Sequence, residues 1–168
     1  MAALVLTAIG DDRAGLVSAL AEVVAEHGGN WERSQMAELA GKFAGIVLVT
    51  VPDSNVDALA RALEPLAGVL DVHAHLGGEQ VTDAQRFTLH LLGNDQPGIV
   101  RDLSAVLSAR NVSIDQLTTV TRDAPMAGGV LFEADAVLEA PAELDYNDLR
   151  AALEDLAGEL MVDITLET

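Results

Sequence analysis

The chain has 168 residues, a net charge of −18 and no cysteine. This length allows one domain or two small ones, and the lack of cysteine excludes disulfides, thiolate catalysis and Cys-ligated zinc. Direct nucleic-acid binding needs clustered basic residues, and the chain has 9 Lys and Arg against 27 acidic residues, so we expect none.

The first half of the chain predicts the order βαββαβ. Leu4–Ile9 is a short apolar run typical of a strand, and apolar residues then recur at helical spacing from Leu16 to Val24 before the stop at Gly28-Gly29. The pattern predicts strands at Asn30–Leu39 and Gly45–Val51, a loop with capping residues at 52–55, a helix carrying Val56, Leu59, Leu63 and Leu66, and a strand at Leu70–Leu76.

The second half repeats this order. Its first helix carries Ile99, Leu103, Val106 and Leu107, each 83 positions after a counterpart, and its second carries Tyr146, Leu149, Leu153 and Leu156, each 90 positions after one. The difference predicts seven inserted residues, in the turn 122–129 and the loop 139–144. We expect the last strand at Leu160–Leu166.

A βαββαβ unit with right-handed crossovers folds into a four-stranded antiparallel sheet with both helices on one face. We therefore predict an α+β protein of two ferredoxin-like units, at 1–76 and 87–168, with a polar linker at 77–86. In that order the first and third strands are central, and they are also the most apolar, with Leu4-Val5-Leu6 and Ile46-Val47-Leu48-Val49. Such strands need cover on both faces, so we expect the halves to pack together and the chain to form a homodimer. The alternative is that the second face of the sheet stays exposed to water, because small side chains make this exposure tolerable.

Each unit has a glycine-flanked turn between its first strand and first helix, Gly10-Asp11-Asp12-Arg13-Ala14-Gly15 and Gly93-Asn94-Asp95-Gln96-Pro97-Gly98. With βαββαβ around each turn, the chain resembles a pair of ACT domains, which are small regulatory modules that bind amino acids. In length and tandem layout it is similar to the glycine cleavage system transcriptional repressor family. The resemblance covers nearly the whole chain.

The turns suit a free amino acid. The first turn of a helix has unpaired N–H groups and the positive end of the helix dipole, which favour a carboxylate, and nearby carboxylates and amides accept hydrogen bonds from an ammonium. The resemblance implies that the ligand also lies near the start of the second strand. The candidate ligand-binding residues are Gly10, Asp11, Asp12, Arg13, Ala14, Gly15, Leu16 and Asn30, with Asn94, Asp95, Gln96, Pro97, Gly98, Ile99 and Ser113 in the second copy.

The same turns also fit a purely structural role, with Asp as helix cap and Gly for the turn. The two copies differ: Ala14 stands where the second has Pro97, and Asn30 where it has Ser113. We favour the first copy as the competent one, because Asn30 matches the asparagine that the family prefers.

Other residues suggest weaker hypotheses. Asp71, His73 and His75 alternate on one predicted strand face, which fits either a metal site or a solvated face; we predict no metal. His27 and His90 are interpreted as structural, and Trp31 as lining a pocket or an interface. No catalytic motif is found, so we predict neither enzyme activity nor a cofactor.

The first functional hypothesis is a regulatory protein that binds a small amino acid, glycine or serine among the candidates, and acts on gene expression or metabolism through a protein partner such as a transcription regulator. The alternative is a ligand-free interaction or dimerisation module. The start Met1–Leu6 lacks a basic flank and precedes Asp11-Asp12, so we expect a first strand and not a signal peptide. No apolar run approaches the ~18 residues of a membrane span, and we expect a soluble, cytoplasmic protein.

Overall fold

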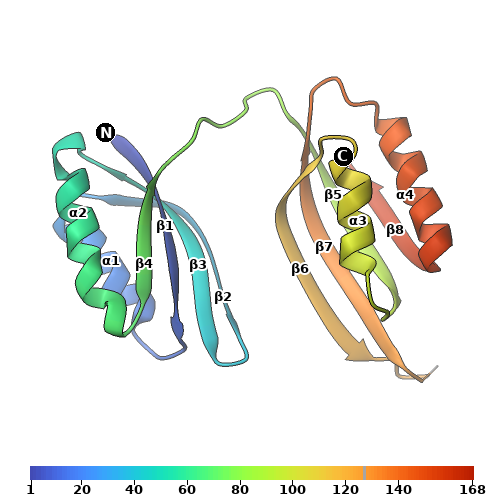
Figure 1. Cartoon of the computed structure of the whole chain (residues 1–168), viewed down its shortest axis with the longest axis horizontal. Coiled ribbons are helices and arrows are strands. Elements are labelled where there is room, and N and C mark those ends of the chain that lie inside the picture. Colours follow the sequence, from blue (N-terminus) through green and yellow to red (C-terminus); the bar gives the residue numbers. More distant parts are fainter. Residues whose placement is uncertain (127) are drawn as a thin grey trace. The chain divides into compact units, whose positions relative to one another are not determined.

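The computed structural model describes residues 1–126 and 128–168, which divide into two compact units, Met1–Gln80 and Val81–Thr168. Each unit is a four-stranded antiparallel sheet with two helices on one face (Figure 1). The predicted tandem ferredoxin-like fold is confirmed. Within the described residues, no helix is long and apolar enough to cross a membrane.

The first unit has the strand order β2-β3-β1-β4, so its first and third strands are central, as predicted. A 3₁₀ turn at Asp53–Asn55 stands where a capped loop was expected, and no side chain caps the helix that follows. The elements of this unit are β1 (Ala2–Asp11), α1 (Leu16–Glu26), β2 (Asn30–Leu39), β3 (Lys42–Val51), α2 (Val56–Leu63), a 3₁₀ segment (Glu64–Gly68) and β4 (Asp71–Leu76).

The second unit has the equivalent order β6-β7-β5-β8. Its last strand begins later than predicted, because α4 continues through Leu160 and ends at Met161, which has a left-handed conformation with φ +53°. The elements of this unit are β5 (Gln85–Asn94), α3 (Ile99–Ser108), β6 (Ser113–Asp123), β7 (Val130–Ala140), α4 (Tyr146–Leu160) and β8 (Val162–Glu167).

Strand register places the inserted residues. Gly10 pairs with Phe43 in the first unit, and Gly93 pairs with Phe132 in the second. Measured from the first strand, the third strand therefore lies six residues later in the second unit than in the first. These six inserted residues lie in the turn between β6 and β7, and the seventh lies between β7 and α4. Both locations agree with the sequence analysis, although Ala127 of that turn lies outside the described residues.

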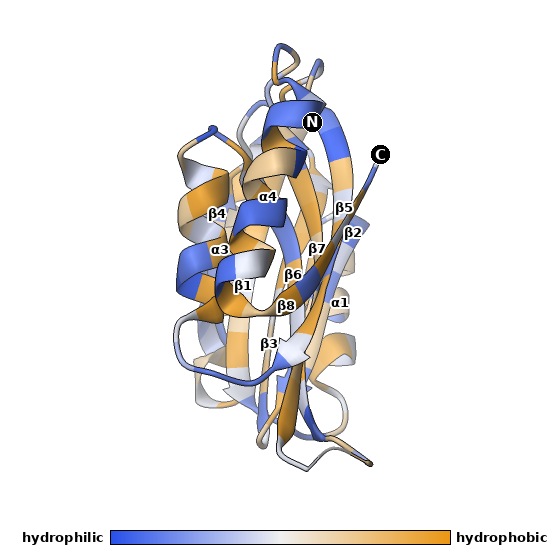
Figure 2. Ribbon diagram, turned by 90° about the vertical axis from the view of Figure 1, so that its right-hand side faces the viewer, coloured by the Kyte–Doolittle hydropathy of each residue, from blue (hydrophilic) through white to orange (hydrophobic). Residues whose placement is uncertain are grey.

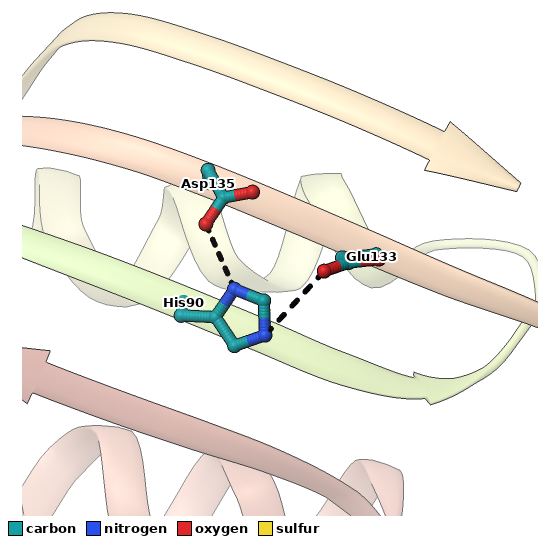
Figure 3. A group of neighbouring side chains, drawn as sticks. All are labelled: His90, Glu133 and Asp135. Carbon is teal, nitrogen blue, oxygen red and sulfur yellow. Dashed lines mark hydrogen bonds and ion pairs between the residues drawn. The ribbon is translucent and has the colours of Figure 1, made fainter.

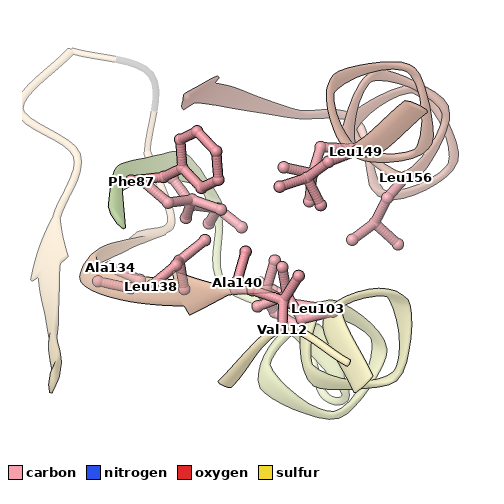
Figure 4. Packing of buried hydrophobic residues seen from close by; sticks show 14 of the residues in the cluster. Phe87, Leu103, Val112, Ala134, Leu138, Ala140, Leu149 and Leu156 are labelled. Carbon is pink, nitrogen blue, oxygen red and sulfur yellow. The ribbon is translucent and has the colours of Figure 1, made fainter. Parts of the chain in front are cut away.

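Each unit has its own apolar core between its sheet and its helices. Alternate residues of the central strands face the helices, and in the first unit Leu6, Val47 and Val49 are fully buried there against Leu20 of α1. Figure 4 shows the second core, where Leu103 of α3 and Leu149 of α4 point toward Phe87 and Leu138 of the sheet. Among the described residues, no buried side chain is polar or charged, so polar chemistry is confined to the surface.

The opposite, open faces of the two sheets differ in chemistry. The first sheet presents Val5, Ile9, Ile46 and Leu48, of which Ile9 and Ile46 are about half exposed. At the positions of Val5 and Ile46 the second sheet has Thr88 and Asp135. The helices, by contrast, show both hydrophilic and hydrophobic segments in Figure 2, as expected for elements with one buried side. At the positions of Ile9 and Leu48 the second sheet has Leu92 and Val137, so the open face of the first sheet is the more apolar of the two and that of the second is mixed.

Candidate functional site

The two glycine-flanked turns connect the first strand of each unit to its first helix. Gly15 and Gly98 occupy the N-cap positions of α1 and α3 with φ of +92° and +96°. Residues with a Cβ rarely adopt this left-handed conformation, which explains the second glycine of each motif. The prediction that an Asp caps the helix is therefore wrong, because glycine holds the cap position and no side chain caps the first turn of either helix.

Backbone hydrogen bonds hold each turn against the neighbouring hairpin. The N–H of Asp12 donates to the carbonyl of Gly41 at 2.9 Å, and the N–H of Asp95 donates to the carbonyl of Val130 at 2.8 Å. The side chains of the turns are mostly exposed, whereas Leu16 and Ile99 are buried in the cores. The side chains of Leu16 and Ile99 therefore anchor the turns in the cores, and a ligand at either turn would meet only the backbone of these two residues.

The second turn is fastened by its own side chains. Gln96 Nε2 donates to the carbonyl of Leu160 at 2.7 Å, across the end of α4. Arg101 Nε donates to Asp102 Oδ1 at 2.8 Å, and this hydrogen bond lowers the pKa of Asp102. The guanidinium of Arg101 also lies beside Gly98. Gln96 of this turn and the neighbouring Arg101–Asp102 pair of α3 are thus engaged with the protein itself.

The first turn borders a surface hollow of about 340 Å³, which we call the turn hollow. Gly10 and Asp11 of the predicted site line it. The other lining residues come from β1, β3, the 3₁₀ segment with the residue after it, and β4: Ile9, Lys42, Ala67, Gly68, Val69 and Asp71. The hollow therefore lies at the strand end of the turn, and Asp12, Arg13, Ala14, Gly15 and Leu16 are not among its lining residues.

Opposite charges meet in the turn hollow. The ammonium of Lys42, the single lysine of the chain, forms an ion pair with the exposed carboxylate of Asp11. The hydrogen bond from Lys42 and then its charge lower the pKa of Asp11. Asp71 lies in the same hollow and forms a 3.2 Å contact with His73. The hollow thus offers one cation and two carboxylates, which complement the two charged groups of a free amino acid.

Sequence reasoning missed Lys42 and Asp71 as site residues. Lys42 pairs with Asp11 across β1 and β3, and Asp71 pairs with Ile9 across β1 and β4. Once the antiparallel register is fixed, cross-strand neighbours of the turn follow from it. The register was the signal that could have identified both residues.

Asn30 lies far from the turn within its own unit. It pairs with Thr50, which pairs with Ala3, whereas Gly10 is seven residues further along β1. At ~3.3 Å per residue this places Asn30 about 23 Å from Gly10 along the strand direction, and two strands away across the sheet. Ser113 lies at the corresponding far end of the second sheet, where it pairs with Glu139. A single unit therefore does not bring together the two halves of the predicted site.

Asn30 is also engaged locally. Its Nδ2 donates to Glu32 Oε1 at 2.8 Å, and Thr50 Oγ1 donates to the same oxygen at 2.8 Å. Both hydrogen bonds lower the pKa of Glu32, and the one from Asn30 has the larger effect. The neighbouring Trp31 is partly buried and packs against the first core, and its Nε1 donates to Ser34 Oγ at 3.2 Å.

The two histidines interpreted as structural, His27 and His90, have different surroundings. His27 Nδ1 lies 2.8 Å from the carbonyl of Val23, as a structural histidine would. His90 is not isolated: it is half exposed and lies beside Asp135 and Glu133. Within residues 1–126 and 128–168, the side chains whose ligand atoms cluster as in a metal site are these three, and not Asp71, His73 and His75.

Comparison with known proteins agrees with this architecture. Residues 2–77 match the family model described as "ACT domain". The chain is 25% identical to the glycine cleavage system transcriptional repressor of Escherichia coli (strain K12) over 163 residues, covering 94% of this chain and 85% of that protein, and a protein of the same description from Shigella flexneri matches equally.

Among solved structures, a protein of unknown function from Galdieria sulphuraria superposes with a TM-score of 0.89 and 32% identity, over 99% of this chain and 97% of that chain. Both units are therefore shared with that protein in sequence as well as in fold.

Proposed function

Since this chain is a tandem ACT-domain protein that resembles the glycine cleavage system transcriptional repressors, we propose that it is a cytoplasmic regulatory protein, without catalytic activity, that binds a small amino acid at the turn hollow of its first unit. The observation that supports this most is the charge arrangement of the hollow: Lys42 faces Asp11, with Asp71 beside them.

In this proposal the ligand inserts between groups that now bind each other. The carboxylate of the amino acid binds Lys42, and its ammonium binds Asp71 and Asp11. The volume of about 340 Å³ is near the lower end for small-molecule sites, which favours a small ligand such as glycine or serine. The second turn is the weaker candidate, because Leu131 stands at the position of Lys42 beside it and its Gln96 already donates to the carbonyl of Leu160.

Asn30 has a defined place in this proposal. Because it lies about 23 Å from Gly10 along the strands of its own unit, it contacts a ligand at this hollow only if it is supplied by a second copy of the chain. In a single copy of the chain, the turn hollow then binds the ligand weakly. A dimer completes the site by adding the Asn30 side chain of the second copy.

The proposed action is through protein partners, a transcription regulator among them. The net charge of −18 repels the phosphate backbone of nucleic acids. The relatives named above are described as transcriptional repressors. Their description together with the negative charge of this chain supports a regulator that acts on another protein and not on DNA directly.

The test is a thermal-shift and calorimetric panel of the twenty amino acids on the wild type and two variants. A ligand present at 100 times its Kd stabilises the folded protein by about 2.7 kcal/mol. Asp71→Asn removes one carboxylate from the hollow and is expected to abolish that shift. Asp163→Asn is the matched control, because Asp163 pairs with Leu92 as Asp71 pairs with Ile9.

Two results would contradict the proposal. The first is no shift with any of the twenty amino acids. The second is binding that survives Asp71→Asn and is lost in Asp163→Asn, which would move the site to the second unit.

A second candidate function is a protein-interaction module without a small ligand, and the open face of the first sheet favours it. Val5, Ile46 and Leu48 line a hollow there of about 360 Å³, with Arg33 and Gln35 at its side. Exposed apolar surface of this kind marks interaction sites. A monomer at micromolar concentration in sedimentation analysis, with no partner recovered by pull-down, would count against this candidate.

A further inference from the structure

His90 on β5 faces two carboxylates from β7 on the open face of the second sheet (Figure 3). Its Nδ1 lies 2.8 Å from Asp135 Oδ1, directly across the strand pair, and its Nε2 lies 3.7 Å from Glu133 Oε1. All three side chains come from central strands, so a rigid scaffold fixes their spacing.

The two ring nitrogens have different partners and therefore different roles. A hydrogen bond from Nδ1–H to Asp135 orients the ring and leaves the Nε2 lone pair directed at Glu133, the arrangement that carboxylates impose on metal-binding histidines. When Nε2 carries no proton, its lone pair and Glu133 Oε1 face each other at 3.7 Å, an arrangement that a bound cation stabilises. The other oxygen of Glu133, Oε2, pairs with Arg122 Nη2 at 3.3 Å, which leaves Oε1 free to bind through one oxygen.

Comparison of the two units shows that the fold does not require this group. The equivalent positions in the first unit hold Thr7, Ala44 and Ile46, with the same strand pairing. The imidazole and both carboxylates are thus found only in the second unit, at places where an uncharged strand surface folds equally well. The group is therefore particular to the second unit and is not part of what the repeated fold requires.

We propose that His90 Nε2 and Glu133 bind a divalent transition-metal ion of the Zn²⁺ type, with Asp135 as the positioning residue for the imidazole. Zn–N and Zn–O distances of about 2.0–2.2 Å place two tetrahedral ligands about 3.4 Å apart, close to the 3.7 Å seen here. An imidazole ligand favours Zn²⁺, Co²⁺ or Ni²⁺ over Mg²⁺ and Ca²⁺.

Water completes the coordination in this proposal. A hollow of about 290 Å³ adjoins the group and is lined by polar side chains that include Thr88, Gln116, Thr118, Thr165 and Glu167. The site is on the open face and has two protein ligands, so moderate affinity is expected. The inference stands independently of amino-acid binding, since it uses no residue of the turn hollow.

The test is a ZnCl₂ titration of the full chain, purified without a His tag, followed by ¹⁵N chemical shifts of the imidazoles and by calorimetry. The chain has four histidines, and the His90 signals are expected to move first. His90→Thr and Glu133→Ala introduce the residues of the first unit, so both variants are expected to fold, and both should weaken zinc binding at least about tenfold. Asp135→Asn should weaken it about 10- to 100-fold while zinc still shifts His90.

The matched control is His73→Thr. His73 lies 3.2 Å from Asp71 on the open side of the first sheet, so it reports what an exposed histidine–carboxylate pair binds by itself. The proposal predicts unchanged zinc affinity in this variant. Zinc binding that is equal in the wild type and in folded His90→Thr, a His73 shift that precedes that of His90, or no binding to the wild type would each overturn it.

Discussion

Gly10 and Gly93 are the first glycines of the two turns, and close packing explains both. A Cβ at Gly10 would lie 2.5 Å from the carbonyl oxygen of Val69, and one at Gly93 would lie 2.3 Å from Val162 Cγ1. Neither residue has a positive φ, so the requirement is space and not backbone conformation. The second glycine of each motif, Gly15 or Gly98, is needed for its left-handed φ. One motif thus satisfies two different physical requirements.

Gly10→Ala tests the space requirement. The new methyl group meets backbone, which cannot rotate away as a side chain can, so the free energy of unfolding is expected to fall by about 1–3 kcal/mol. Urea denaturation measures it. Gly158→Ala is the control: Gly158 lies in α4 with nothing within 4 Å, and alanine there should stabilise the protein by about 0.5–1 kcal/mol. A loss in both variants would contradict the packing explanation.

At the scale of elements, each pair of helices covers one face of its own sheet with equivalent residues. Leu20 of α1 and Leu103 of α3 are both buried, at 0% and 2% exposure, and they occupy the same position in the repeat. The helix faces are preserved in both units, whereas the turns beside them differ in Arg13-Ala14 against Gln96-Pro97. Packing therefore constrains the helices more strongly than it constrains the turns.

Leu20→Ala is expected to destabilise the first unit by about 2–5 kcal/mol, because it removes buried methyl groups and leaves a cavity. Trp31 is the single tryptophan and packs against the first core, so its fluorescence reports unfolding of that unit. The urea midpoint of the Trp31 signal should fall in Leu20→Ala.

Leu103→Ala provides the comparison, because its cavity lies in the second core. Its main effect is expected in the far-ultraviolet circular dichroism of the chain. An equal shift of the Trp31 midpoint in both variants would show instead that the two units unfold together.

At the scale of the whole molecule, the two units share a fold and differ in their open faces. The first sheet presents apolar residues, and the second presents the polar hollow and the His90 group. Three strands of 10 residues and one of 6 cover roughly 600 Å² per face, or about 1,200 Å² when two such faces pair, which is the lower end for specific interfaces. The first face is therefore suited to a second copy of this chain, and we predict a dimer formed through it.

Ile46→Asp tests this dimer. It gives the first sheet the residue that the second sheet has at the same position, Asp135, so it should fold. Two added carboxylates buried in a two-fold interface disfavour association, and sedimentation velocity should show a shift from dimer to monomer at micromolar concentration. Thr88→Asp adds the same charge to the open face of the second sheet and should leave the dimer intact. Loss of the dimer in Thr88→Asp alone would place the interface on the second sheet.

The sequence by itself determined the duplicated βαββαβ order, because apolar periodicity and glycine stops are local signals and each was present twice. It also identified the turns, where one missing Cβ and one left-handed residue leave a readable pattern. Tertiary structure alone decided which side chains meet. Register brought Lys42 and Asp71 to the first turn, moved Asn30 to the far end of its sheet, and set His90 against Asp135. These contacts join strands that are distant in the chain, and a one-residue change in register would reverse which side chains share a face.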